Sequence, residues 1–427
     1  MGEEVKGARG LLEEWQSLVR WPNVVWQVFH LATGGVLLML LWVVLARLWG
    51  PDRYGWFNYL FVIITLSGVL ADFGLDVLLT RTVASAPNAK KIPRHILNSK
   101  FLTLSGSMVI FCVLAMWFPA GLVSPFLVLL VGVLLFSATN FLNGFLRGID
   151  RLDLEAKVGL LQKSTFVLAS LFGVWFMHLG LLWVGFCYLI SHVLGLCCTW
   201  GLMTPYRPLI SRDVSGRDSP YRSLSEALPL LSIAVLMFLV LRMDIFLLKW
   251  LAGPRTVGIY AAAFRFVEGF VLICTAYMMA LFPRLVAFRR EAGIFSFMVR
   301  RSLALLISGG LLAAVLIWWL APYLTAGLMG PSFITSEKIL RGLSIVLPAL
   351  FISALLGQIL IAHSKQHLYA LALGTGMGIS VAVDLWAIPR WGAWGAVIGV
   401  WVRESFQVAS LAVLAARQFD MKKILTG

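Results

Sequence analysis

Several charged side chains lie within stretches of the sequence that are otherwise apolar, and nine of them are candidates for function. A charge at the centre of a membrane helix costs roughly 2.5–3.5 kcal/mol, so such a side chain usually binds a substrate, binds an ion or pairs with a neighbour. Arginine and lysine suit anionic groups, whereas closely spaced carboxylates suit a proton or a cation. The candidate substrate-binding residues are Arg242, Arg265, Arg403 and Lys163, and the candidate ion- or proton-coupling residues are Asp72, Asp76, Asp244, Glu268 and Glu404.

Two of these groups fall in neighbouring apolar segments. Arg265 and Glu268 are three residues apart, which puts them on one face of a helix. Arg242 and Asp244 lie at a similar depth in the preceding segment. The four residues form either the polar wall of a central cavity or an ion-pair cluster that joins two helices, and the sequence leaves both open.

Arg403 and Glu404 lie near the middle of the last apolar segment, where neither side chain can reach water easily. Their adjacency puts them about 100° apart around a helix, so at most one is expected to point straight into a cavity. A functional role is favoured here over snorkelling.

Asp72 and Asp76 are spaced i, i+4 on one helix face, where like charges repel. A proton or Na⁺ held between them is one hypothesis. Pairing with Lys163 or Arg81 is the alternative. Lys163 itself either faces a cavity or extends toward the cytoplasmic surface.

Three further polar residues, Asn140, Asn143 and Arg147, share one helix face. They either line a cavity or hold helices together, and the second role is the commoner one. Asp384 is expected to reach water near the outer end of its helix.

Membrane helices must position these side chains. Of the 427 residues, 60% are hydrophobic and 13% charged, against about 45–50% and about 25% in a soluble domain. This excludes a soluble enzyme, a secreted domain and a disordered protein. Because a spanning helix needs ~20 mostly apolar residues, the sequence predicts an all-α polytopic membrane protein with about twelve spans: 24–46, 56–79, 101–118, 124–146, 158–177, 179–202, 228–250, 258–281, 302–321, 342–362, 367–388 and 392–415.

Basic residues predict the orientation of the chain. There are 35 Lys and Arg against 20 Asp and Glu, a formal charge of +15. With a cytoplasmic N-terminus, 24 basic residues, Lys100 and Arg147 among them, fall on the cytoplasmic side and 7 outside, as the positive-inside rule requires. We expect a multi-pass protein of the cytoplasmic membrane with both termini in the cytoplasm. The charge reflects topology, not a nucleic-acid partner.

The loops divide the chain into two halves. We expect a cytoplasmic or interfacial segment at 1–20, a six-helix bundle at 21–203, a linker at 204–225, a second six-helix bundle at 226–416 and a tail at 417–427. The motif G-P-x-x-x-G begins at Gly50 and again at Gly253, an offset of 203 residues that also relates Arg81 to Arg284. An even number of spans in each half predicts parallel repeats around a central cavity.

Motifs of enzymes and metal sites are absent from the sequence. It contains no Walker loop, no H-E-x-x-H and no G-x-S-x-G, its five cysteines lack C-x-x-C spacing and its six histidines are scattered. We therefore expect no catalytic residue, no metal site and no cofactor, apart from possible coupling to H⁺ or Na⁺.

Several stretches resemble a known family in their order and spacing. They read VLARLWGPDRYGWFNYLF (44–61), LADFGLDVLLTR (70–81), FLNGFLRGIDR (141–151), LRMDIFLLKWLAGPRTVGIYAAAFRFVE (241–268), LFPRL (281–285) and GPSF (330–333). Together they resemble the polysaccharide transport family of oligosaccharide flippases, in the multidrug/oligosaccharidyl-lipid/polysaccharide exporter superfamily.

The resemblance implies two six-helix bundles that open alternately to either face and move a polyprenyl-pyrophosphate-linked oligosaccharide from the inner to the outer leaflet, for surface polysaccharide biosynthesis. By position, Arg242, Arg265 and Arg403 are the cations that could hold the anionic head group. The expected partners are the lipid-linked oligosaccharide, membrane lipids and other polysaccharide-assembly membrane proteins.

Three alternatives stay open: a peptidoglycan-precursor (lipid II) flippase, a cation-coupled exporter of the same superfamily, and a membrane polysaccharide polymerase or ligase. The first would add two helices, and the third a large outer loop. The first span, 24–46, lacks an acidic residue, which disfavours cation-driven drug export.

Overall fold

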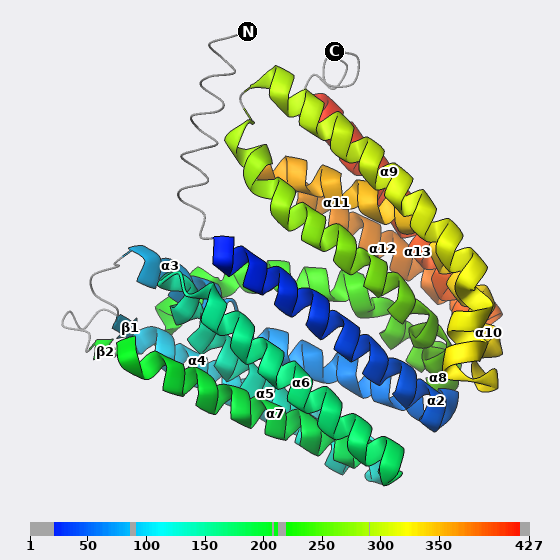
Figure 1. Ribbon diagram of the computed structural model, residues 1–427, viewed down its shortest axis with the longest axis horizontal. Coiled ribbons are helices and arrows are strands. Elements are labelled where there is room, and N and C mark those ends of the chain that lie inside the picture. Colours follow the sequence, from blue (N-terminus) through cyan, green and yellow to red (C-terminus); the bar gives the residue numbers. More distant parts are fainter. Residues whose placement is uncertain (1–20, 86–90, 207–208, 212–218, 290, 419–427) are drawn as a thin grey trace.

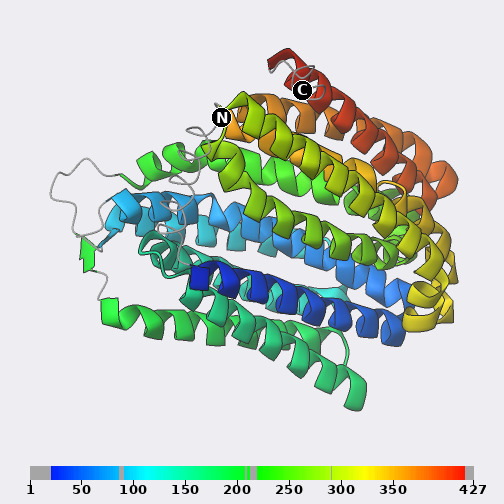
Figure 2. The same cartoon turned by 45° about the horizontal axis from the view of Figure 1, so that its top comes forward.

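The computed structural model describes residues 21–85, 91–206, 209–211, 219–289 and 291–418. The predicted interfacial segment 1–20 lies outside these residues, as does most of the predicted tail. The described part is almost entirely helical, as an apolar chain in a membrane must be, because lipid offers no partner for backbone polar groups. Figures 1 and 2 show these helices running side by side along one common direction.

The first half of the chain forms one bundle, coloured blue to green in Figure 1. The short strands β1 and β2 pair in parallel over three residues, with Lys91 opposite Leu209, and join two of its connecting segments. The bundle's elements are α2 (Trp21–Asp72), α3 (Leu75–Ser85), β1 (Lys91–Pro93), α4 (Arg94–Ala115), α5 (Ala120–Gly148), α6 (Leu152–Phe176), α7 (Leu181–Met203), η1 (Thr204–Tyr206) and β2 (Leu209–Ser211).

The second half forms the other bundle, coloured green to red. Its elements are α8 (Pro220–Ala287), α9 (Ala292–Pro322), η2 (Tyr323–Met329), η3 (Pro331–Phe333), α10 (Ile334–Ser344), α11 (Leu347–Ala362), α12 (Gln366–Trp391) and α13 (Ala393–Gln418). Helix α8 begins at Pro220, inside the segment predicted as a linker. The predicted tenth span is bent by 44° between α10 and α11.

Two helices are too long for one crossing and fold back at a glycine. Helix α2 has 52 residues and α8 has 68, which at about 1.5 Å per residue far exceeds a hydrocarbon core of about 30 Å. The chain turns at Gly50 (φ 69°, ψ 175°) and at Gly253 (φ 81°, ψ 173°), a backbone region open essentially to glycine alone. Pro51 and Pro254 then start the next helix, a position that suits proline. The sequence predicted loops between the first and second spans and between the seventh and eighth. In the structure each is a turn at a single glycine, hereafter a joint.

The number of spans agrees with the sequence. Nine helices in the described part are long and apolar enough to cross a membrane, and the bent pair containing α10 and α11 makes a tenth. Dividing α2 at Gly50 and α8 at Gly253 gives the twelve predicted spans. The all-α polytopic fold of two six-helix bundles is confirmed.

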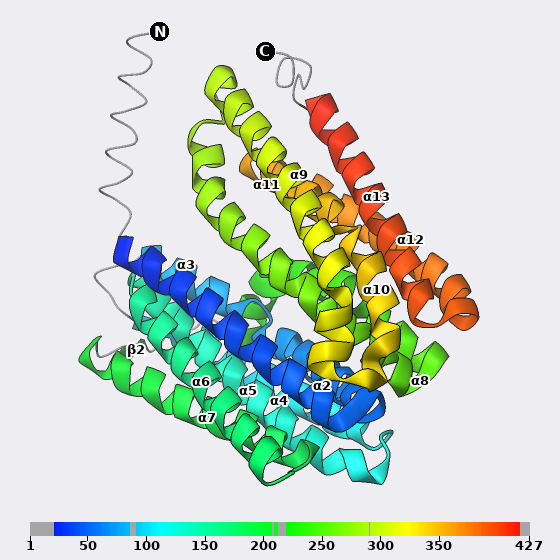
Figure 3. The same ribbon diagram turned by 45° about the vertical axis from the view of Figure 1, so that its right-hand side comes forward.

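The two joints pack against each other. A Cβ atom added to Gly55 would lie 1.8 Å from the carbonyl oxygen of Pro254, and one added to Gly258 would lie 2.0 Å from the carbonyl oxygen of Pro51. This reciprocal contact is what a two-fold repeat predicts, and it requires glycine at both positions. The bundles meet at this end, hereafter the Gly-Pro end, and diverge toward the end where α2 begins and α13 finishes (Figures 1 and 3).

Candidate functional site

A cluster of two arginines and one glutamate lies on α8, beside the first bundle. Arg242 Nη2 lies 2.7 Å from Glu268 Oε1, and Arg265 Nη1 lies 2.7 Å from Glu268 Oε2. Arg242 and Arg265, which the sequence placed in neighbouring apolar segments, are thus brought together through the carboxylate of Glu268. Two guanidinium groups share one carboxylate, so the cluster carries a net positive charge.

Arg265 also contacts the first bundle. Its Nη2 donates to Asn58 Oδ1 at 3.1 Å, and its guanidinium lies 4.1 Å from the centre of the Trp42 ring. Both partners are on α2. A cation over an indole face is attracted by the ring quadrupole. Arg265 therefore holds its position at the boundary between the two bundles, although its sequence neighbours give no sign of this.

Arg242 and Glu268 line a cavity of about 500 Å³ in the second bundle, together with Arg403 and Glu404. The last two are buried and paired, with Arg403 Nε 3.1 Å from Glu404 Oε1. Arg403 also donates to the carbonyl of Val240. The expectation that at most one of the adjacent pair faces a cavity is wrong, because long side chains on one wall can both reach it.

Asp244 does not join the arginine cluster, contrary to the grouping expected from the sequence. Its Oδ1 accepts a hydrogen bond from the backbone N–H of Ile245 at 2.8 Å, and its Oδ2 accepts one from the Tyr260 hydroxyl. Asp244 and Tyr260 are both buried. The two residues lie on the two halves of α8 and join them.

Asp384 on α12 is also buried, with 2% of its surface exposed. The expectation that it reaches water is therefore wrong. Ser380 Oγ lies 3.3 Å from Asp384 Oδ2, while Asp384 Oδ1 has no hydrogen-bond partner within the described chain. A Cβ added to Gly399 would lie 1.9 Å from this oxygen. Asp384 is within electrostatic range of Asp244 and Arg403.

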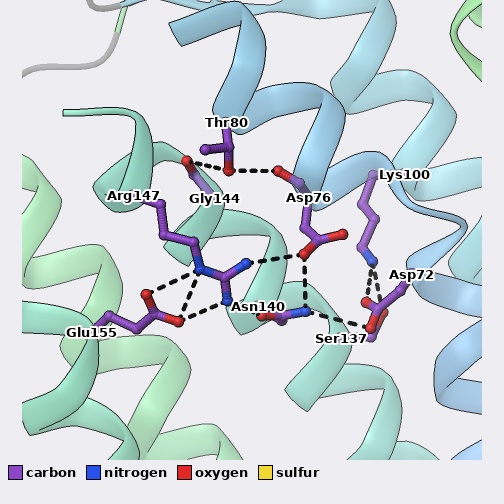
Figure 4. Close-up of polar contacts among 9 residues, drawn as sticks. All are labelled: Asp72, Asp76, Thr80, Lys100, Ser137, Asn140, Gly144, Arg147 and Glu155. Carbon is purple, nitrogen blue, oxygen red and sulfur yellow. Dashed lines mark hydrogen bonds and ion pairs between the residues drawn. The ribbon is translucent and has the colours of Figure 1, made fainter. Parts of the chain in front are cut away.

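The first bundle holds its own polar network, which joins α2, α3, α4, α5 and α6 (Figure 4). Lys100 is 3% exposed, and its Nζ lies 3.1 Å from Asp72 Oδ1. Ser137 Oγ also donates to Asp72 Oδ1, at 2.6 Å. The positive partner of Asp72 is thus Lys100, a residue that the sequence placed at the cytoplasmic surface.

Arg147 forms the other end of this network. Its Nη1 lies 3.0 Å from Asp76 Oδ2, its Nη2 lies 2.7 Å from Glu155 Oε1, and it also donates to Asn140 Oδ1 at 2.6 Å. The expected pairing of Asp72 and Asp76 with Lys163 or Arg81 is therefore wrong. The two aspartates are on different helices, because α2 ends at Asp72 and a turn at Phe73 and Gly74, both with positive φ, precedes α3. Both still accept from Asn140 Nδ2, at 3.4 and 3.5 Å.

Among the described residues, Lys163 makes no contact with that network but lines the same cavity as Arg147 and Glu155, which measures about 360 Å³ and lies inside the first bundle. Its Nζ lies 3.2 Å from His30 Nε2. Asn140, Asn143 and Arg147 line the same cavity, so their shared helix face does face a cavity. Arg147 also joins helices, so both roles that the sequence left open are present.

The structure also contains functional candidates that the sequence did not single out. Lys100, Tyr260 and His30 each touch a charged residue of the sites above. In the sequence, only the position of Lys100, directly before an apolar run, hinted at a role. Every basic residue at a membrane boundary has such a position, so it does not single out Lys100. Within the described ranges, no group of three or more His, Cys, Asp or Glu residues could hold a metal ion.

Comparison with solved structures places the fold. The chain matches an inward-facing multidrug resistance MATE family transporter of the MOP superfamily with 17% identity and a TM-score of 0.70, over 92% of this chain and 96% of that one. It matches an outward-facing MATE family transporter with 16% identity and a TM-score of 0.66, over 93% and 95%. A MOP superfamily transporter from Pyrococcus furiosus, described as having a binding pocket of reverse polarity, matches with 15% identity and a TM-score of 0.66, over 92% and 95%.

No curated protein sequence matches the chain. The family of polysaccharide biosynthesis proteins matches residues 23–288, which is more than half of the chain. The solved structures that the chain resembles are transporters, and at 16–17% identity this likeness shows a shared fold. The chain therefore belongs to the polysaccharide biosynthesis protein family and has the fold of the MOP superfamily transporters.

Proposed function

We propose that the protein is a flippase that moves a polyprenyl-pyrophosphate-linked oligosaccharide across the cell membrane by alternating access. The observation that carries this proposal is the shared carboxylate: Arg242 and Arg265 converge on Glu268 at the edge of a cavity. Family membership supports a polysaccharide precursor as the substrate. No covalent step is required, since the substrate leaves unchanged.

The arginine cluster suits a pyrophosphate. Each guanidinium has five N–H donors in a fixed fork that matches phosphate oxygens in pairs. Glu268 occupies only part of that capacity in the structure, and two arginines around one carboxylate leave one positive charge without a counter-ion. A pyrophosphate supplies negative charge and several acceptors in one compact group. Glu268 would then hold the two guanidinium groups in place for the pyrophosphate.

An apolar groove beside the cluster suits the polyprenyl tail. The groove, about 450 Å³, lies between the first part of α2 and the second part of α8, and Leu272 lines both this groove and the charged cavity. Gly269, which follows Glu268 directly, is also in its wall. A lipid substrate needs an apolar path of this kind next to its polar site, because the tail must stay in lipid while the head group crosses.

Alternating access would require the Gly-Pro end to open. In the structure this end is closed by the reciprocal contact of Gly55 with Pro254 and of Gly258 with Pro51. Tyr54 and Phe333 pack edge to face at the same end, with ring centres 6.0 Å apart. We propose that this is the outer end of the protein, with both termini in the cytoplasm, as the basic residues predict.

Coupling to H⁺ or Na⁺ would involve Asp244 and Asp384. Three buried carboxylates, those of Asp244, Asp384 and Glu404, lie within electrostatic range of Arg403. Asp244 is also within range of Arg242, which pairs with Glu268. An excess of buried negative charge is costly unless a proton or a cation offsets it. Asp384 Oδ1 has no partner in the described chain and is the position at which a proton would be gained and lost.

The test is transport in reconstituted vesicles. Head groups exposed on one face are counted with a membrane-impermeant lectin, for the wild-type protein and for Arg242→Ala and Arg265→Ala. Since a hydrogen bond to a charged group contributes about 1.5–3 kcal/mol, each variant is expected to lose about tenfold or more in rate. Arg222→Ala is the matched control, because Arg222 is on the same helix but pairs with Glu226 at the surface. Wild-type rates in both cavity variants would overturn the site.

The alternatives predict different outcomes. A lipid II flippase would move a peptidoglycan precursor in the same vesicles and leave the oligosaccharide lipid behind. A cation-coupled drug exporter would show transport of an organic cation instead. A polymerase or ligase would change the length of the glycan, which gel analysis of the extracted lipid would reveal.

A further inference from the structure

The cavity inside the first bundle has the composition of a carbohydrate site. It measures about 360 Å³ and is formed by α2, α5, α6 and α7, a size within the usual range for a small ligand. Asn140 in its wall is engaged by Arg147, Asp72 and Asp76, whereas Asn143 and Gln162 keep capacity for hydroxyl groups beside their contacts with Thr199 and His192. Three amides in all line the cavity, with four aromatic rings that can cover the apolar faces of a sugar ring. These residues are Asn140, Asn143, Gln162, Phe61, Phe136, Phe166 and Tyr188.

Lys163 is a cation in the wall of this cavity that has no carboxylate partner of its own in the described chain. Arg147, the other cation in the wall, is neutralised by Glu155 and Asp76. Within the described chain, Lys163 forms no salt bridge, and its only polar contact is the 3.2 Å approach to His30 Nε2. Because an ammonium group only donates, His30 must be neutral and accept at that nitrogen. Glu155 also lines the cavity, but its carboxylate pairs with Arg147, so a negative group of a ligand could pair with Lys163 directly.

The helix backbones are shaped around these polar side chains. A Cβ added to Gly34 on α2 would lie 2.4 Å from Lys163 Cδ, and one added to Gly159 on α6 would lie 2.4 Å from His30 Cε1. Helix α2 thus has a glycine where Lys163 of α6 packs against it, and α6 has a glycine where His30 of α2 packs against it. Lys163 is held inside the bundle by this arrangement, and the alternative of snorkelling to the surface does not apply.

The cavity is close to the arginine cluster along α2. Phe61, in its wall, is one helical turn from Asn58, which accepts a hydrogen bond from Arg265. Leu38 lines the cavity, whereas its neighbours Met39 and Leu40 line the apolar groove assigned to the lipid tail. A substrate whose pyrophosphate is at Arg265 would therefore have its sugars within reach of the first bundle.

The geometry points to the first-bundle cavity as a subsite for a carboxylate-bearing sugar, such as a hexuronic acid, with Lys163 as the residue that binds its carboxylate. This inference rests on the proposed function, because it deepens the choice of substrate. The neutral amides and the aromatic rings of the cavity favour a sugar as the ligand. Lys163, which has no carboxylate partner in the described chain, favours a sugar that carries a carboxylate. A bare phosphate would use the cation but not the amides or the rings.

Transport of two matched lipids tests this assignment. Both carry the same polyprenyl pyrophosphate and the same first sugar, and the second sugar is glucuronic acid in one and glucose in the other. Because a carboxylate gains a charge-assisted contact with Lys163, the wild-type protein is expected to move the glucuronic acid lipid about tenfold faster. Lys163→Gln should reduce this preference to below about twofold, measured as the ratio of the two rates within each variant. Lys163→Arg should keep the preference.

Lys157→Gln is the matched control, since Lys157 is on the same helix but exposed, with its Nζ 4.0 Å from Asp153. Equal rates for the two lipids in the wild-type protein, or an unchanged preference in Lys163→Gln, would overturn the subsite while leaving the flippase function in place. Failure to move either lipid would count against the proposed function.

Direct binding then decides the subsite alone. Methyl glucuronide, methyl glucoside and inorganic pyrophosphate are compared by saturation-transfer NMR on the purified protein. A glucuronide signal that Lys163→Gln abolishes supports the subsite. Binding of pyrophosphate alone through Lys163 contradicts it.

Discussion

The two bundles share their joints but not their charges. Gly50 and Gly253 have the same backbone conformation and are related by 203 residues. The same offset relates Arg242 to Met39 and Glu268 to Thr65, while Asp72 corresponds to Thr275. The repeat therefore preserves the residues that fold the helices back and the pair Arg81 and Arg284, whereas Arg242, Glu268 and Asp72 have no charged counterpart in the other half.

The charges of the two bundles are also arranged differently. In the first bundle, Lys100 and Arg147 are surrounded by three carboxylates and tie five helices together. In the second, two arginines share Glu268, and one of them, Arg242, lines a cavity with it. A network whose cations are saturated within the protein stabilises the fold, whereas a cluster with unused donors can bind an anion. This contrast predicts that the first set affects stability most and the second set affects binding most.

The largest effect on stability is expected for Lys100→Met. Removing one partner of a buried ion pair leaves the other charge unpaired and typically costs about 3–5 kcal/mol, and Lys100 is almost fully buried beside Asp72. The free energy of unfolding in mixed detergent micelles should fall by this amount. The double variant with Asp72→Asn should recover part of the loss. A single variant as stable as wild type would show that the network does not hold the bundle together.

An intermediate effect is expected at the joints. Gly50→Ala and Gly253→Ala place a Cβ in a backbone region that costs about 1–3 kcal/mol for other residues. Since the two glycines have nearly identical φ and ψ, the two losses in unfolding free energy should be equal within error. Gly121→Ala, a position with open space around it and an ordinary helical backbone, is the control and should cost nothing. Clearly unequal losses would argue against a structural repeat.

The smallest effect is expected for Arg222→Ala. Its pair with Glu226 is exposed and spaced i, i+4 on α8, and such pairs contribute about 0.3–0.5 kcal/mol. The unfolding free energy should change by no more than that. A loss comparable to that of Lys100→Met would show that depth in the membrane does not govern the strength of these pairs.

The sequence was sufficient to predict the architecture. Apolar runs of about twenty residues can only be spanning helices, and the G-P-x-x-x-G repeat located the two joints and the division into halves. The closeness of Arg265 to Glu268 followed from helix periodicity. These features depend on local chemistry, which the order of residues contains.

Partners across helices could not be predicted from the sequence. Asp72 pairs with Lys100 and Asp76 with Arg147, and both pairs depend on how α4 and α5 pack against α2 and α3. Asp384 was expected at the surface from its depth alone, yet it is buried because α13 brings Gly399 against it. Such contacts depend on the rotation of each helix about its axis, which hydropathy does not determine.

Binding of polyprenyl pyrophosphate to the purified protein tests the central claim most directly. The claim is that the cluster of Arg242, Arg265 and Glu268 binds the pyrophosphate, whereas the first-bundle network serves the fold. Affinity should fall about tenfold or more in Arg265→Ala and stay within about twofold of wild type in the exposed control Arg222→Ala. Unchanged affinity in Arg242→Ala and Arg265→Ala, with both variants folded, would contradict the claim.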